Sequence, residues 1–183
     1  MGRTHPEVER SDKVDAIVEV AERAFLADGY AGATMSQLAD QAGVAPNAIY
    51  WYFASKDHLF VAVGERLLAR LVAEAADKHS LPLTEQLAWA LERMEMLRGV
   101  VSTLHERSER SAVVADFHRR FHQVLRDLLV SALRDEGLDD ADLALAADAL
   151  IAVAESLYAH HEQPARRAQV IDFAIKRLVP GSR

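Results

Sequence analysis

The chain has 183 residues, half of them apolar, and no cysteine. This length and apolar share suit one domain or two small joined ones with a buried core, and they exclude a disordered acidic tail. Without cysteine there is no disulfide, thiol nucleophile or cysteine-bound zinc, which favours a reducing, cytoplasmic location. No run approaches about 18 consecutive apolar residues, and the first thirty residues carry charges throughout. We therefore expect neither a membrane span nor a secretory signal.

The net charge is −7, which argues against non-specific coating of nucleic acid but leaves room for a local contact surface. Alanine occurs 32 times, whereas glycine and proline together number 13. Because alanine is the best helix former and the other two are the worst, the composition predicts an all-α fold.

The first pattern along the chain is that of a helix followed by a short capped helix. Apolar residues recur at helical spacing over 12–28, and Gly29 follows as a left-handed stop. The run from Thr34 to Gln37 has the capping-box pattern, with a hydroxyl at the cap and an amide three residues on. It predicts a short helix over 35–42.

A second short helix is predicted directly after the first. Gly43 breaks the helix over 35–42, and Pro46 occupies a position where the first turn of a helix tolerates proline, so the next helix covers 46–52. Two short helices joined by a glycine-containing turn meet the requirement of a helix-turn-helix. In that motif one helix braces across the phosphate backbone and the second enters the major groove. A purely structural helical hairpin is the alternative, because short helix pairs occur in many bundles.

The rest of the chain stays helical in pattern. Ser55 can cap a long helix over about 56–78, and Gly99 predicts a break in the stripe that runs from Leu87 to Leu104. Three further helices complete the pattern: one over about 114–132, ended by Gly137, and two over about 140–161 and 165–179, separated at Gln163-Pro164. The sequence therefore predicts a bundle of about nine helices.

Residues at many fixed spacings lie within about 12–60. They are Ala24-Phe25, Gly29-Tyr30, Thr34, Leu38-Ala39, Ala42-Gly43-Val44, Ile49-Tyr50-Trp51-Tyr52-Phe53, Lys56 and Leu59. This set resembles the DNA-binding segment of the TetR family of bacterial transcriptional regulators, and the remainder is similar to that family in length and helical layout. The resemblance implies a helix-turn-helix DNA-binding domain over 1–54 and a helical effector-binding and dimerisation domain over 55–183.

The resemblance also implies a surface that contacts DNA. Its residues are Thr34, Ser36, Pro46, Asn47, Ala48, Tyr50, Trp51, Tyr52 and Lys56. Hydroxyls at the start of a helix suit a phosphate, the Asn47 amide can bond a base edge, and Ala48 can pack against a thymine methyl. Tyr50, Tyr52 and Lys56 match positions that contact the phosphate backbone in the family. The alternative to a contact with DNA is that Tyr50 and Trp51 simply pack inside a small domain.

The segment departs from the family pattern in its charge and in one cap. The helix over 46–52 has no Arg or Lys, so bidentate reading of guanine is excluded there, and Ala45 stands where the family often has Ser or Thr. Residues 1–56 carry five basic and eight acidic residues, a net charge of −3, so counterion release on DNA is modest. The arm before the first helix either supplies positive charge to DNA or is a solvated tail; its basic residues are Arg3, His5, Arg10 and Lys13.

Two helix-turn-helix units related by a dyad can bind a palindrome, which one unit cannot. The last two helices present apolar faces rich in small residues, and in the family this pair makes a four-helix dimer bundle. The residues expected at this interface are Leu143, Ala147, Leu150, Ala154, Leu157, Ile171, Ile175 and Leu178. Their use in the core of a single chain is the alternative.

Large or adaptable side chains in the middle helices are candidates for lining a small-molecule pocket. They are Trp89, Met96, Phe117, His118, Phe121 and His122. Core or surface positions are the alternative for each of them. A ligand there would be small and largely apolar, and it would act by favouring a different tilt of the helix over 56–78.

No catalytic or metal-binding motif accompanies these features. No Glu or Asp is followed by His three residues later, as a di-metal carboxylate site needs. His118 and His122 could share a metal on one helix face, but no acidic residue is spaced with them, so we expect no metal and no cofactor. Phosphate-binding loops and hydrolase motifs are missing from the sequence, which argues against an enzyme.

The expected function is therefore that of a homodimeric DNA-binding regulator. We expect it to be a repressor that a small effector releases from a palindromic operator in double-stranded DNA. The alternative is an all-helical protein-interaction module without DNA binding.

Overall fold

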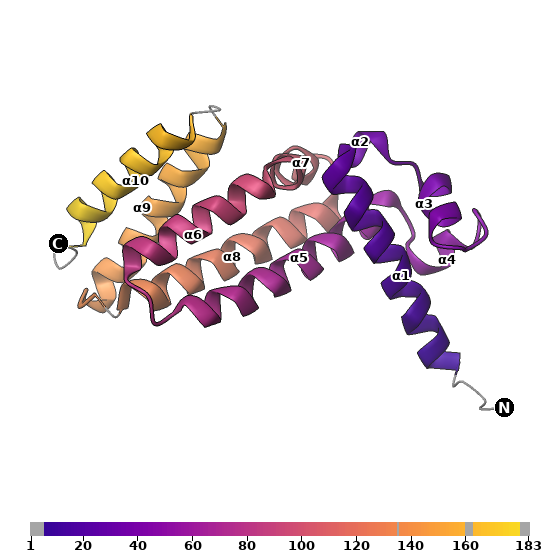
Figure 1. Cartoon of the computed structure of the whole chain (residues 1–183), viewed down its shortest axis with the longest axis horizontal. Helices are drawn as coiled ribbons and strands as arrows, with labels where there is room; N and C mark the ends of the chain where they lie inside the picture. Colours follow the sequence, from indigo (N-terminus) through magenta and orange to yellow (C-terminus); the bar gives the residue numbers. More distant parts are fainter. Residues whose placement is uncertain (1–5, 135, 160–162, 180–183) are drawn as a thin grey trace. The chain divides into compact units, whose positions relative to one another are not determined.

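The structure is a computed structural model that describes residues 6–134, 136–159 and 163–179. Within these ranges the chain is built from ten α-helices and has no strand, which confirms the predicted all-α fold (Figure 1). The helices are α1 (Pro6–Ala27), α2 (Gly29–Gly32), α3 (Met35–Gln41), α4 (Ile49–Tyr52), α5 (Lys56–Lys78), α6 (Leu83–Met96), α7 (Arg98–Ser108), α8 (Ala112–Arg134), α9 (Asp140–Ala159) and α10 (Pro164–Leu178). Among the described residues, none of these helices is long and apolar enough to cross a lipid bilayer.

The chain divides into two compact units. Unit 1 contains the residues up to Leu68 together with Gly99–His118, and unit 2 contains Ala69–Arg98 together with the residues from Arg119 onward. Long helices α5 and α8 contribute residues to both units. The division of function expected at residues 54 and 55 stays a prediction, because these units describe packing and not function.

Unit 1 is organised around α1. This helix packs against α2 and α3, and α3 packs against α4. An aromatic cluster joins α1 to the start of α5, with ring centroids of Phe25 and Tyr30 5.7 Å apart and those of Tyr30 and Phe60 5.4 Å apart. Fully buried apolar side chains complete the interior: Ile17, Ala21, Leu38, Ala39, Ile49 and Leu59.

The ends of α1 differ from the sequence prediction. The helix begins at Pro6, so Arg10 and Lys13 lie on α1 and not on an arm before it, whereas Arg3 and His5 lie outside the described residues. Proline at a helix start is compatible with this longer helix, since the first N–H groups have no partner in the helix. Gly29 has a φ of +73°, as expected of a left-handed stop. The chain then forms the one-turn helix α2, which accounts for the tenth helix.

The expected break at Gly99 is wrong by two residues. The chain leaves α6 at Leu97, whose backbone N–H bonds to the Arg93 carbonyl at 3.1 Å, and Gly99 lies inside α7. A single glycine costs a helix only about 1 kcal/mol, so packing of the neighbouring turns decides where the helix ends.

Unit 2 contains a core made largely by α9 and α10, which lie side by side, with α6 also against α10 (Figure 1). Five of the residues expected at a dimer interface are buried in this core of the single chain: Leu143, Ala147, Leu150, Ile171 and Ile175. Ala154 and Leu157 are partly buried against the same core. Both helices therefore bury one apolar face against their own chain, and the expected dimer interface stays a prediction.

Other side chains form the exposed apolar surface of α9 and α10. Leu145 is 69% exposed and Phe173 61% exposed, and Leu178, from the expected interface, is also exposed. Phe173 has the Arg177 guanidinium 5.4 Å from its ring centroid. Among the described residues, Leu145, Phe173 and Leu178 are the large apolar side chains that α9 and α10 leave exposed.

Candidate nucleic-acid interface

The start of α3 is fixed by a reciprocal pair of hydrogen bonds. The Gln37 backbone N–H donates to Thr34 Oγ1 at 3.3 Å, and the Thr34 backbone N–H donates to Gln37 Oε1 at 3.0 Å. This capping box confirms the helix start predicted from the sequence. Thr34 and Ser36 are both exposed, so the hydroxyls expected to face a phosphate lie at the surface.

The turn after α3 requires glycine. Gly43 has a φ of +66°; its N–H bonds to the Asp40 carbonyl at 3.2 Å, and the Val44 N–H bonds to the Ala39 carbonyl at 3.0 Å. These two bonds form a Schellman motif, which ends a helix with one residue in the left-handed region. Glycine adopts that region without strain, so Gly43 fixes the direction in which the chain leaves α3.

The second helix of the motif is shorter than predicted. Residues 46–48 form a turn, in which the Ala48 N–H bonds to the Ala45 carbonyl at 2.8 Å, and α4 covers only Ile49–Tyr52. No side chain caps this start, because its N-cap residue is Ala48, which has no polar side chain. The expected helix over 46–52 is thus a turn followed by one helical turn.

One side of this segment is buried and the other is exposed. Ile49 and Phe53 are buried in unit 1, whereas Trp51 is 82% exposed and Tyr50 51% exposed. Pro46 and Asn47 are exposed, and Ala48 and Tyr52 are partly exposed. The exposure of Tyr50 and Trp51 argues against the alternative in which both rings pack inside the domain. Two large exposed aromatic rings at consecutive positions typically mark an interaction surface.

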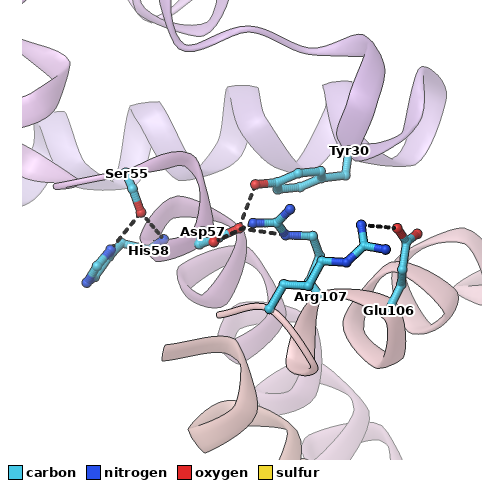
Figure 2. Close-up of polar contacts among 7 residues, drawn as sticks. Tyr30, Ser55, Asp57, His58, Glu106 and Arg107 are labelled. Carbon is cyan, nitrogen blue, oxygen red and sulfur yellow. Dashed lines mark hydrogen bonds and ion pairs between the residues drawn. The ribbon is translucent and has the colours of Figure 1, made fainter. Parts of the chain in front are cut away.

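Lys56 is the first residue of α5 and follows α4 closely in the sequence. Ser55 caps the helix, since the His58 N–H donates to Ser55 Oγ at 3.3 Å (Figure 2). The Lys56 Nζ lies 4.2 Å from the ring centroid of Tyr30, within the range of a cation–π contact. Lys56 is half-buried, and burial is the main cause that lowers its pKa. The nearby positive charge of Arg107 lowers it further.

Asp57, the next residue, is the centre of a polar network. Arg107 of α7 donates from Nε to Asp57 Oδ1 at 3.0 Å and from Nη2 to Oδ2 at 2.7 Å, and the Tyr30 hydroxyl donates to Oδ1 at 2.6 Å (Figure 2). Burial alone would raise the pKa of Asp57, but hydrogen bonds from Arg107, Tyr30 and Ser111 hold it below its usual value. Burial and the Asp57 carboxylate raise the pKa of Tyr30 to about 12.

Sequence reasoning missed this network. Tyr30 and Lys56 both belong to the set that resembles the family, but Arg107 stands 50 residues from Asp57 and carries no motif. An acidic residue directly after a helix cap is commonly explained by the helix dipole, so the sequence holds no signal that would pair Asp57 with a distant cation.

The side chains expected in an effector pocket differ in exposure. Phe117 is buried in unit 1 against Gly64. A Cβ added to Gly64 would lie 2.5 Å from Cε1 of Phe117. Phe121 is buried and Trp89 is partly buried, whereas Met96 is 70% exposed, as a surface residue would be. No ligand tests this set, so the effector pocket stays a prediction.

The histidines of the middle helices have partners within each unit. In unit 1 the rings of His105 and His118 meet edge to face with centroids 4.8 Å apart, and His105 Nδ1 lies 2.8 Å from the Val101 carbonyl oxygen. In unit 2 His122 Nδ1 lies 2.9 Å from Glu155 Oε1, an acidic partner that spacing along the sequence did not indicate. The expectation of no metal stays a prediction.

The geometry of the segment from α3 to α4 is that of a known class of DNA-binding proteins. A capped bracing helix, a glycine turn and an exposed one-turn helix define the class of helix-turn-helix proteins. Residues 17–63 match the family model described as bacterial regulatory proteins, tetR family. An HTH-type transcriptional repressor of Mycobacterium tuberculosis is 30% identical over 174 residues, covering 86% of this chain and 88% of that protein. The chain therefore belongs to the TetR family, whose members are DNA-binding transcriptional regulators.

Two further comparisons support the family and the fold. The HTH-type transcriptional repressor AcnR of Corynebacterium diphtheriae is 30% identical over 97 residues, which cover 49% of this chain and about half, 51%, of that repressor. The crystal structure of a transcriptional regulator from Rhodococcus sp. Rha1 superposes with a TM-score of 0.73 at 19% identity. That match covers 92% of this chain and 97% of the other, and it shows the same fold.

Proposed function

We propose that this chain is a homodimeric repressor that binds a palindromic operator and leaves it when a small, largely apolar effector binds. The observation that carries the DNA-binding part is the exposure of Tyr50 and Trp51 on a helical turn whose Ile49 is buried. Burial of Ile49 holds the turn in place, while the rings and the preceding Asn47 project to solvent, as a reading surface requires. Residues 1–54 carry this surface in the proposal, and residues 55–183 carry the effector and dimer functions.

A binding experiment tests this proposal. Fluorescence anisotropy with duplex DNA from upstream of the chain's own gene should show salt-dependent binding, which Trp51→Ala weakens at least about tenfold, or 1.4 kcal/mol. Trp51 is exposed, so its removal leaves the fold intact. Val72→Ala is the matched control, because it also removes an exposed apolar side chain but lies in unit 2. Equal affinities of both variants and the parent would contradict the assigned surface.

Support for repression and for release by an effector comes from the relatives and not from a bound ligand. The two relatives compared above are named as repressors, which favours repression over activation. Within unit 2, the candidate pocket residues Trp89, Phe121 and His122 have the apolar and amphipathic side chains that suit a small effector. The place of action in this proposal is the cytoplasm, and no enzymatic activity is assigned.

Support for dimerisation rests on the exposed apolar surface of α9 and α10. Leu145, Phe173 and Leu178 remain exposed after the core residues of these helices are buried. Burying such side chains against a second copy would remove apolar surface from water and would hold two reading segments on one DNA.

A further inference from the structure

We propose that Arg107, Asp57 and Tyr30 position Lys56 for a DNA phosphate, so that Arg107 is a positioning residue for DNA binding although it lies on α7, outside the helix-turn-helix. This inference rests on the proposed function, because it assigns a role within the same DNA interface. Tyr30 of α2, Asp57 of α5 and Arg107 of α7 meet within unit 1 (Figure 2). The ammonium group of Lys56 lies over the ring of Tyr30.

The contact between Arg107 and Asp57 fixes the start of α5. Both guanidinium bonds are directed to the two carboxylate oxygens, and the pair is mostly shielded from solvent, with side-chain exposures of 27% and 14%. Such a charged fork sets orientation as well as distance. Because Asp57 is the second residue of α5, the fork determines where the first turn of this helix lies, and with it the backbone of Lys56.

The ring of Tyr30 fixes the side chain of Lys56. The Lys56 Nζ lies 4.2 Å and the Arg107 Cζ 5.1 Å from the centroid of this ring. The ring itself is held by packing against Phe25 and Phe60 and by its hydroxyl bond to Asp57. A lysine side chain is otherwise flexible, so a fixed ring beneath its ammonium group reduces the conformational freedom lost on binding a phosphate.

The charge balance gives Arg107 a second effect on Lys56. Asp57 stays ionised in this site, since its hydrogen bonds keep its pKa low. Arg107 neutralises that carboxylate. Without Arg107, an uncompensated negative charge would stand one residue from Lys56, where it would compete for the ammonium group and repel an incoming phosphate.

The experiment measures DNA affinity against salt concentration for the full chain. The probe is the same upstream DNA, and the variants are Arg107→Ala, Lys56→Ala, Arg107→Ala with Asp57→Asn, and the control Arg110→Ala. Arg110 pairs with Glu106 at 3.3 Å, and both side chains are exposed, so the control removes the same charge three residues away. Each phosphate contact contributes about 0.9 to the slope of log K against log salt.

We expect Arg107→Ala to lower affinity about tenfold and to reduce this slope by about one contact, as Lys56→Ala does, whereas Arg110→Ala keeps the slope. Adding Asp57→Asn to Arg107→Ala should restore the part of the affinity that the uncompensated charge removes, while the slope stays reduced because the fork is still missing. A merely structural role would not produce this rescue, since the double variant has lost every bond of the fork.

Two results with the Arg107→Ala variants would overturn the inference. One is a normal slope for Arg107→Ala while Lys56→Ala loses a contact, which would leave the proposed function intact. The other is failure of Asp57→Asn to restore affinity in a double variant that thermal unfolding shows to be folded. A parent chain that does not bind the DNA at all would overturn the proposed function as well. If Arg107→Ala does not fold, Tyr30→Phe, which removes only the hydroxyl bond to Asp57, should reduce the same slope, and an unchanged slope would contradict the inference.

Discussion

The helix-turn-helix segment and the last two helices show how differently apolar residues are used in two regions of this chain. Around α4 the large aromatics Tyr50 and Trp51 are exposed, while the smaller Ile49 is buried. In α9 and α10 the regularly spaced aliphatic residues are buried in the chain's own core, and Leu145 and Phe173 remain at the surface. Apolar periodicity therefore identifies a helix in both regions but does not say which molecule covers each side.

The difference follows from how much of each helix is apolar. In the one-turn helix α4, Ile49 is buried, Tyr50 and Trp51 are exposed, and Tyr52 is partly exposed. Helix α9 is rich in Ala and Leu on several sides, and a helix of this kind can bury one side in its own chain and offer another to a partner. The comparison of these two regions leads to substitutions that separate the buried side from the exposed side.

The largest effect is expected for Leu150→Glu. Leu150 is buried in the core of unit 2, so a carboxylate there would lose its hydration without a partner. We expect the free energy of unfolding to fall by more than about 4 kcal/mol, measured by urea denaturation. The matched control is Ala152→Glu on the same helix, which should change it by less than about 0.5 kcal/mol because Ala152 is exposed. Similar losses for both variants would mean that α9 faces the core with a different side.

A smaller loss of stability is expected for Gly64→Ala in unit 1. The added Cβ would lie 2.5 Å from Phe117 Cε1, so the buried ring must move. Overpacking of this kind costs about 1–3 kcal/mol, which thermal and chemical denaturation would detect. Gly99→Ala is the control, because a Cβ there has nothing within 4 Å. It should be neutral or stabilising, since alanine is the better helix former.

A comparable or smaller loss, of about 1–3 kcal/mol at neutral pH, is expected for Asp57→Asn, which removes the charged bonds to Arg107. The pKa of Asp57 is lower in the folded chain than its ordinary value of 3.8. Its contribution to stability is therefore present above that ordinary value and is lost as the pH falls through the lower, folded value. The difference in unfolding free energy between the parent and the variant should be constant at neutral pH and shrink only in acid. A difference that disappears near neutrality would contradict the low pKa.

The sequence predicted those parts of the interface that depend on near neighbours. The capping box of Thr34 and Gln37 and the left-handed turn at Gly43 are bonds between residues at most five apart, so their residue types and spacing are sufficient evidence. The pairing of Asp57 with Arg107 could not be predicted from the sequence. Many acidic and basic residues are equally plausible partners there, and only the folded chain brings this pair together.

The length of α4 and the buried side of α9 were beyond sequence reasoning for a related reason. Both depend on tertiary packing: α4 is held by burial of Ile49, and α9 by the core that it shares with α10. Apolar spacing is the same whether a side faces its own chain or a second copy. The burial of Leu150 in the core of its own chain could not be predicted for this reason, whereas the helix itself was predicted.

The smallest effect on the fold, and the sharpest test of the exposed side, is expected for Phe173→Glu. Phe173 is 61% exposed, so the unfolding free energy of the single chain should change by less than about 0.5 kcal/mol. If α9 and α10 form the dimer contact, light scattering should nevertheless report a shift from two chains to one, because the substitution places like charges across the dyad. Ala168→Glu adds the same charge at an exposed position on another side of α10 and should leave the mass unchanged. A dimer that survives Phe173→Glu would place the contact elsewhere on unit 2.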